Sequence, residues 1–340
     1  MSEALASQLQ NGVTILSRAF CAIALALLTG CDTGDPEPSP YPLVVSGQLS
    51  DDAVRYHQLY RVSLDGEVAP LFSFRDISVY RPACTDDGQR VAFESSRGGS
   101  VHEPALWVLE GGHARPLAED ADGDPLWGRF GEWAPDGRRA VVAQSDFCLA
   151  GCYGGDLTVI DAETGTTTEL TSGSAFDLTP AWTLDGRWIA FVSDRAGEDE
   201  WGLFAISPDG TGLRQITGAP AEGGAIIELT RGPGPSDVTY VERVWVGDLP
   251  EYRYGIVDVG TGVARPFPDV PLPLGVRNLA SLEWSPDGSD IVFSAQRYEA
   301  YHLSSRVIYH YDATNGQTTS ILGRPYEGQG PFYSAWCPPV

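Results

Sequence analysis

The sequence contains no lysine, because all 22 of its basic residues are arginines. This absence excludes any mechanism that needs a lysine amine as a Schiff-base former or general base. Positive charge is also scarce overall, with 22 basic against 46 acidic residues and a formal net charge of −24. A nucleic-acid-binding surface needs clustered positive charge to release counterions, so we expect no nucleic-acid partner. Basic proteins, cations and neutral polymers remain as ligand classes.

The short motifs that mark common catalytic sites are missing as well. There is no Gly-x-Ser-x-Gly nucleophile elbow, no His-Glu-x-x-His motif, no phosphate-binding loop and no dinucleotide fingerprint. We therefore expect a binding protein rather than an enzyme, with no catalytic residues, no cofactor and no resident metal.

Near the N-terminus a short apolar run, Ala19 to Leu28, follows Arg18. A run of this length is too short to persist as a membrane-spanning helix and is typical of an export signal. Leu28-Thr29-Gly30-Cys31 resembles a bacterial lipobox. The resemblance implies a lipoprotein signal peptide, residues 1–31, ending at a lipidated Cys31 that holds the protein at a membrane. An ordinary secretion signal with a chance cysteine is the alternative.

Residues 32–41, DTGDPEPSPY, are acidic and proline-rich without hydrophobic periodicity, which predicts a solvated tether. We therefore expect the mature protein in the bacterial cell envelope, lipid-anchored, monomeric, and facing the periplasm or the cell exterior.

Glycine and proline are abundant, with 39 and 25 residues, and many of them belong to an internal repeat. The clearest copy, residues 180–195, reads PAWTLDGRWIAFVSDR, and related copies begin near residues 82, 132 and 283. The turn aspartates Asp87, Asp136 and Asp185 recur every 49 residues, and Asp287 follows after about two more periods. One copy between them, within Ile226 to Pro268, has therefore lost its motif.

Each copy predicts the same local structure. A short strand ends at tryptophan, an Asp-Gly turn reverses the chain, and a β-branched and aromatic strand follows. A hairpin completes the unit. Six such hairpins are recognisable, at Leu59–Phe72, Leu106–Leu117, Leu157–Leu170, Leu203–Thr217, Gly255–Phe267 and Ile308–Ile321. Six hairpins imply six four-stranded units.

The Trp-Ser-Pro-Asp-Gly repeat with a downstream Ser-Asp-Arg resembles the repeat of TolB-like β-propellers. The resemblance covers residues 42–340 and implies an all-β, six-bladed propeller with four antiparallel strands per blade. Tyr333 to Trp336 looks like the first strand of a repeat whose remaining strands begin at Leu43. We expect these two segments to pair and close the ring. The α/β domain that precedes the propeller in TolB has no counterpart in the tether, so a role in the Tol–Pal system does not follow.

Four cysteines follow Cys31 in a chain expected to be exported, where disulfides are permitted. Cys148 and Cys152 flank three residues and are expected to bridge within one loop. Cys84 occupies the tryptophan position of its repeat and Cys337 follows Trp336, so a bridge between them would staple the closure. Two free buried thiols are the alternative, and a metal site is less favoured.

Candidate ligand-binding residues lie in the expected loops after the second strand of a blade. His57, His102 and His302 fall in such loops of consecutive blades. Aromatic residues accompany them, namely Tyr298, Tyr301 and, in another such loop, Trp201. These side chains suggest a shared polar and aromatic pocket, and the alternative is unrelated surface histidines. Arg97, Arg195 and Arg297 recur at one repeat position, which predicts structural pairing with turn carboxylates.

The leading hypothesis is a membrane-anchored extracytoplasmic binding or scaffold protein that holds a protein or peptide partner at a propeller face or in its channel. Some TolB-like propellers resemble polysaccharide lyases with metal-binding histidines, so a metal-dependent lyase is one alternative. A glycan-binding protein is the other. Fold resemblance alone does not choose between them.

Overall fold

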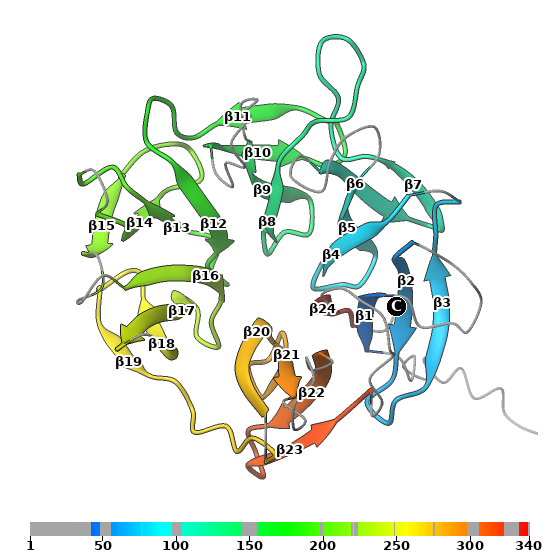
Figure 1. Ribbon diagram of the computed structural model, residues 1–340. Coiled ribbons are helices and arrows are strands. Elements are labelled where there is room, and N and C mark those ends of the chain that lie inside the picture. The colour runs from blue at the N-terminus through cyan, green and yellow to red at the C-terminus, as the bar shows by residue number, and fades with distance from the viewer. Residues whose placement is uncertain are drawn as a thin grey trace, which may run out of the picture. The chain divides into compact units, whose positions relative to one another are not determined.

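The computed structural model describes residues 42–47, 56–75, 77–96, 104–144, 155–197, 200–218, 220, 224–247, 249–274, 276–297, 306–322 and 333–338. Regular structure in these residues is entirely β-strand, in six four-stranded antiparallel sheets. The sheets stand around a central axis as the blades of a propeller (Figure 1). The predicted fold class is therefore confirmed. None of the described residues belongs to a helix that is long and apolar enough to cross a membrane.

The strands occupy equivalent positions in the six blades. The innermost strands, in ring order, are β24 (Tyr333–Trp336), β4 (Val79–Cys84), β8 (Arg129–Trp133), β12 (Asp177–Trp182), β16 (Ala225–Arg231) and β20 (Val276–Trp284). The second strands are β1 (Leu43–Gly47), β5 (Arg90–Ser95), β9 (Arg139–Gln144), β13 (Ile189–Ser193), β17 (Asp237–Val246) and β21 (Asp290–Arg297). The third strands are β2 (Gln58–Val62), β6 (Ala105–Glu110), β10 (Asp156–Asp161), β14 (Gly202–Ile206), β18 (Leu249–Asp258) and β22 (Arg306–Asp312). The outermost strands are β3 (Val68–Phe72), β7 (His113–Pro116), β11 (Thr167–Glu169), β15 (Arg214–Thr217), β19 (Ala264–Pro266) and β23 (Gln317–Ser320).

The ring closes as predicted, because β24 pairs antiparallel with β1 in one sheet. Leu43 lies opposite Trp336, and the Cys337 amide donates a 2.7 Å hydrogen bond to the Pro42 carbonyl. A disulfide joins Cys337 to Cys84, the last residue of β4, with the two Cα atoms 5.2 Å apart. The closing blade is therefore held both by its own ladder and by a covalent link to the next blade.

The turns after the inner strands follow the repeat. The Thr183 hydroxyl donates to the Asp185 carboxylate at 2.7 Å, and that carboxylate accepts the Arg187 amide at 3.0 Å. Gly186, which follows Asp185, has a φ of 67°, a left-handed conformation that glycine adopts without steric cost. This side-chain capping explains why the aspartate and glycine recur.

Tryptophans at the ends of three inner strands, β8, β20 and β24, donate hydrogen bonds to the preceding blade. The Trp133 indole donates to the Ala83 carbonyl at 2.9 Å, and the Trp336 indole donates to the Glu283 carbonyl at 3.1 Å. The core around Trp133 combines residues from two sheets, such as Leu106 of β6 and Val142 of β9. The hydrophobic core therefore lies between the blades.

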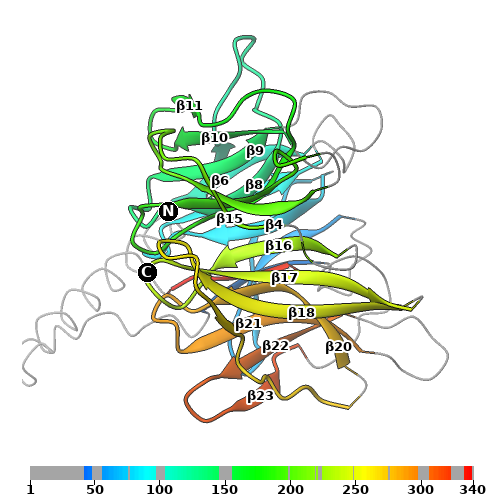
Figure 2. The same cartoon turned by 90° about the vertical axis from the view of Figure 1, so that its left-hand side faces the viewer.

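The blade formed by β16 to β19 occupies the segment predicted to have lost its motif. Arg231 ends its inner strand, 49 residues after Trp182, at the position where the other inner strands end in tryptophan or Cys84. Its middle strands, β17 and β18, form a hairpin of ten residues per strand that extends past the neighbouring strands (Figure 2). The side chains of Trp245 and Val246 near its tip are 46% and 49% exposed.

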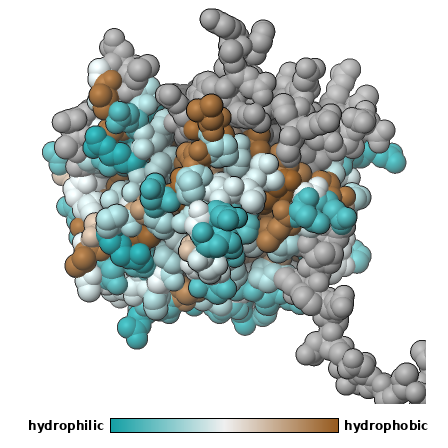
Figure 3. Space-filling view, turned by 90° about the horizontal axis from the view of Figure 1, so that it is seen from below, coloured by the Kyte–Doolittle hydropathy of each residue, from teal (hydrophilic) through white to brown (hydrophobic). Residues whose placement is uncertain are grey.

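The outer rim is largely polar. The side chains of β11 and β19 are exposed along their full length. One side of the rim shows hydrophilic side chains interspersed with smaller hydrophobic groups (Figure 3). Polar outer strands limit edge-to-edge pairing with other chains.

Arg195 differs from its predicted pairing. Its guanidinium donates to both carboxylate oxygens of Asp177 at 2.7 Å, and Asp177 begins β12 rather than lying in a turn. The guanidinium also stacks over the Phe191 ring. Arg97 lies outside the described residues, as does the side chain of Arg297.

Candidate functional site

The inner strands are bulged where they pass the central axis. The ladders of β4, β8, β12 and β16 each shift register by one residue, and that of β20 does so twice. Three non-glycine residues at these bulges, Arg81, Thr179 and Ser281, have φ values of 45°, 45° and 49°. Such backbone is sparsely populated, and its clustering is typical of functional sites, where bulges re-aim side chains.

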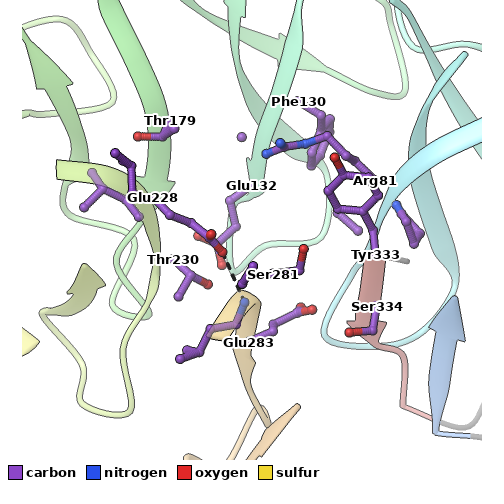
Figure 4. A pocket seen from close by; sticks show the side chains of 17 residues that line it. Arg81, Phe130, Glu132, Thr179, Glu228, Thr230, Ser281, Glu283, Tyr333 and Ser334 are labelled. Carbon is purple, nitrogen blue, oxygen red and sulfur yellow. Dashed lines mark hydrogen bonds between the residues drawn. The ribbon is translucent and has the colours of Figure 1, made fainter. Parts of the chain in front are cut away.

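The bulges surround a pocket of about 280 Å³ (Figure 4). All six inner strands contribute to it, so the pocket lies on the propeller axis. Its polar and charged lining consists of Arg81, Glu132, Thr179, Glu228, Thr230, Ser281, Glu283, Tyr333 and Ser334. The lining runs from Tyr333 at the start of β24 to Glu132 and Glu283, the penultimate residues of β8 and β20. A second, smaller cavity lies nearer the strand ends, where Asp86 and Arg231 contribute.

Arg81 is anchored by Glu94, a carboxylate whose side chain is fully buried. Glu94 accepts the Phe130 amide at 3.1 Å and a 2.8 Å hydrogen bond from Arg129, and it lies 3.5 Å from the Arg81 Nε. The guanidinium of Arg81 also lies 5.5 Å from the centre of the Tyr333 ring. The positive group at this side of the pocket is therefore held in place by Glu94, a carboxylate that it shares with Arg129.

Arg231 makes a second network across the axis. It donates two 2.8 Å hydrogen bonds to Asp86 and one to the Trp133 carbonyl at the same distance. Its Nε lies 3.0 Å from an oxygen of Glu132. The side chain of Arg231 is only 13% exposed, so these contacts link three blades in a largely desolvated setting.

Carboxyl groups outnumber guanidinium groups around the pocket. Burial, together with repulsion from Asp86, raises the pKa of Glu132 to about 7, although Arg231 partly offsets the rise. Burial and repulsion from Glu132 hold the pKa of Glu283 well above its usual range. Glu228, from β16, accepts the Leu282 amide at 3.1 Å. Three carboxyl groups from three blades thus meet one cavity.

The residues predicted for a ligand site do not line this pocket where the structure describes them. His57 is 7% exposed, and its ring lies 5.0 Å from that of Tyr80. Trp201 packs partly buried against the core of the blade containing β12. The two lie in blades on opposite sides of the ring. The other predicted residues fall outside the described residues, and they are His102, His302, Tyr298, Tyr301, Cys31, Cys148 and Cys152. Among the described side chains, no three His, Cys, Asp or Glu residues form a group able to hold a metal ion.

Sequence reasoning did not single out the pocket residues, although one signal for them was present. Glu132 and Glu283 directly precede the tryptophan of their repeats, where other copies have alanine, such as Ala181. A charged residue that interrupts an otherwise apolar inner strand faces the axis. Arg231, at a position where other copies have tryptophan, is likewise a charged residue at the end of an inner strand.

Comparison with known proteins supports the architecture. No protein-family model matches the chain. An uncharacterized protein of Agrobacterium fabrum is 25% identical over 69% of this chain and 77% of its own length. A TolB homologue of Chlorobium chlorochromatii is 32% identical over 142 residues, which are 41% of this chain and 29% of that protein. The crystal structure of TolB from Acinetobacter baumannii matches with a TM-score of 0.60 at 18% identity, covering 90% of this chain and 68% of that one. The described part of the chain therefore has a six-bladed β-propeller fold that is similar to the propeller of TolB.

Proposed function

We propose that this protein is an extracytoplasmic binding module that holds a protein or peptide partner at the pocket on the propeller axis. The observation that carries the proposal is the convergence of all six inner strands, three of them with left-handed backbone at a bulge, on one charged cavity. A structural core needs neither left-handed backbone at Arg81 nor buried carboxyl groups, both of which cost stability. Their presence together indicates a site shaped for a ligand.

The similarity to TolB and its homologues supports a protein partner within the cell envelope. The strongly acidic composition disfavours nucleic acid. No observation among the described residues specifically favours a metal-dependent lyase or a glycan-binding protein. His57 is buried away from the pocket, and Trp201 packs against its own blade. We accordingly propose a non-enzymatic role.

A crosslinking pulldown from intact cells tests the proposal. Thr230→Trp would fill the pocket from β16, and Thr319→Trp places the same side chain on the exposed outer strand β23. We expect the Thr319 variant to capture the same partner as the unaltered protein and the Thr230 variant to lose it. Equal capture by both folded variants would contradict docking at the axis.

Anchoring at a membrane through Cys31 belongs to the same proposal and rests on the lipobox resemblance. We expect Cys31→Ser to move the protein from the membrane fraction to the soluble fraction after cell lysis. Retention of the variant on membranes would contradict the anchor while leaving the pocket proposal unaffected.

A further inference from the structure

The charge around the axial pocket is unbalanced in a specific way. The guanidinium groups present are already engaged, Arg81 with Glu94 and electrostatically with Glu228, and Arg231 with Asp86 and Glu132. Glu283 from β20 adds a further carboxyl group, which Glu132 repels. Carboxyl groups in a cavity of low polarity repel one another, and a cation placed between them relieves the repulsion.

Hydrogen-bonding capacity in the pocket is also unused. Ser334 of β24 is only 6% exposed, and its hydroxyl has no hydrogen-bond partner. This hydroxyl points into the pocket (Figure 4). One oxygen of Glu132 is likewise buried without a partner. Buried polar atoms are normally satisfied, so an unpartnered carboxyl oxygen and an unpartnered hydroxyl, which can accept as well as donate, leave room for a hydrogen-bond donor beside the cavity.

We propose that the pocket binds a guanidinium group, presented by an arginine side chain of the partner. A guanidinium is always charged and carries five N–H donors in one plane. It can therefore donate to carboxylates that approach from different blades and to the Ser334 hydroxyl at the same time. The inference rests on the proposed function, which it deepens by naming the chemistry of the docking group.

The test compares two capped tripeptides by isothermal titration to the full chain, at mildly alkaline pH, above the pKa of about 7 of Glu132. Gly-Arg-Gly carries the cation, and Gly-citrulline-Gly has nearly the same shape without the charge. We expect the arginine peptide to bind at least about tenfold more tightly. Equal affinity for the two peptides, or no binding of either, would overturn the inference.

Variants of the pocket carboxyl groups add a second arm. Glu283→Gln and Glu228→Gln each should remove most of the preference for arginine over citrulline, while preserving side-chain volume. Glu163→Gln is the matched control, because Glu163 is 47% exposed and pairs with Arg138 outside the pocket. The proposed site would be contradicted if Glu163→Gln lost the preference for arginine over citrulline. It would also be contradicted if both folded pocket variants kept that preference.

Failure of this inference is distinguishable from failure of the proposed function. If Thr230→Trp abolishes partner capture but the two peptides bind alike, the axial docking site stands and the guanidinium assignment is wrong. If the arginine peptide binds selectively but no partner depends on the pocket, the assignment stands and the protein-binding proposal is wrong.

Discussion

Glu132 is a buried carboxyl group next to both a like charge and an opposite one. Its pKa of about 7 exceeds the usual value of 4.5 because burial and Asp86 disfavour ionisation more than Arg231 favours it. Between these two values the folded protein holds a proton that the unfolded chain has lost. Stability contributed by this proton is therefore full below pH 4.5 and disappears as pH rises toward 7.

We expect the free energy of unfolding to fall by about 1–3 kcal/mol from pH 5 to pH 8 because of such groups, since one pKa unit is worth about 1.4 kcal/mol. Glu283 acts in the same direction. Glu132→Gln mimics the protonated form and should flatten the profile, as measured by urea denaturation across this range. The exposed Glu163→Gln should leave the slope unchanged. An equally steep profile in Glu132→Gln would contradict the assignment.

The hydroxyl that begins three of the turns, from Thr85, Thr183 and Ser285, is a second feature at the residue scale. Thr183 bonds both the Asp185 carboxylate and the Trp188 amide, at 2.7 and 3.1 Å. We expect Thr183→Ala to cost about 1 kcal/mol, the typical net value of such bonds. Thr183→Ser keeps the hydroxyl and should cost less. Chemical denaturation of the two variants measures the difference, and equal losses would mean that the methyl group, not the hydroxyl, stabilises the turn.

At the scale of the strand, the repeat made the fold predictable. The residues of an Asp-Gly turn determine its backbone conformation locally, so the turn can be recognised in each copy of the repeat that keeps them. The strand ends at Trp133 and Trp182 are predicted from the position of the turn. Spacing between copies then fixed the number of blades. The blade without the motif was located by spacing alone.

The pocket was not predictable in the same way. Which inner-strand side chains face the axis depends on a one-residue bulge, and a bulge at Arg81 or Ser281 is set by contacts between blades rather than by local sequence. The burial that shifts the Glu132 pKa is likewise a property of the closed ring. Loop histidines attracted attention because histidine is chemically versatile, whereas glutamates within a repeat resembled ordinary surface residues.

Arg231 replaces a tryptophan at the end of β16 and substitutes polar contacts for packing. Removing one partner of a buried ion pair typically costs about 3–5 kcal/mol, because the other charge stays buried. We expect Arg231→Met to lose about 3 kcal/mol and the double variant Arg231→Met/Glu132→Gln to recover part of the loss. Denaturant midpoints of the single and double variants form the cycle. Strict additivity would show that Arg231 and Glu132 are energetically independent.

At the scale of the whole molecule, closure determines whether the axial pocket exists. Its lining includes Tyr333 and Ser334 from β24, a strand contributed by the far end of the chain. Any opening between β24 and its neighbours therefore disrupts the pocket, even though β4 to β20 could remain folded. Ligand binding and ring closure are thus thermodynamically linked.

The disulfide between Cys84 and Cys337 spans 253 residues, so it restricts the unfolded chain strongly. In the chain-entropy model such a long loop gives a stabilisation near the upper end of the usual range, about 4–5 kcal/mol. We expect the Cys84→Ser/Cys337→Ser double variant to lose about 2–5 kcal/mol in urea denaturation and reductant to reproduce the loss in the unaltered protein. Reductant should have no such effect on the double variant.

Because β24 also forms the pocket, the double variant should lose peptide affinity at urea concentrations that leave most of the strand structure intact. If peptide affinity and strand structure were instead lost at the same urea concentration, the six blades would unfold as one unit and the disulfide would stabilise all of them equally.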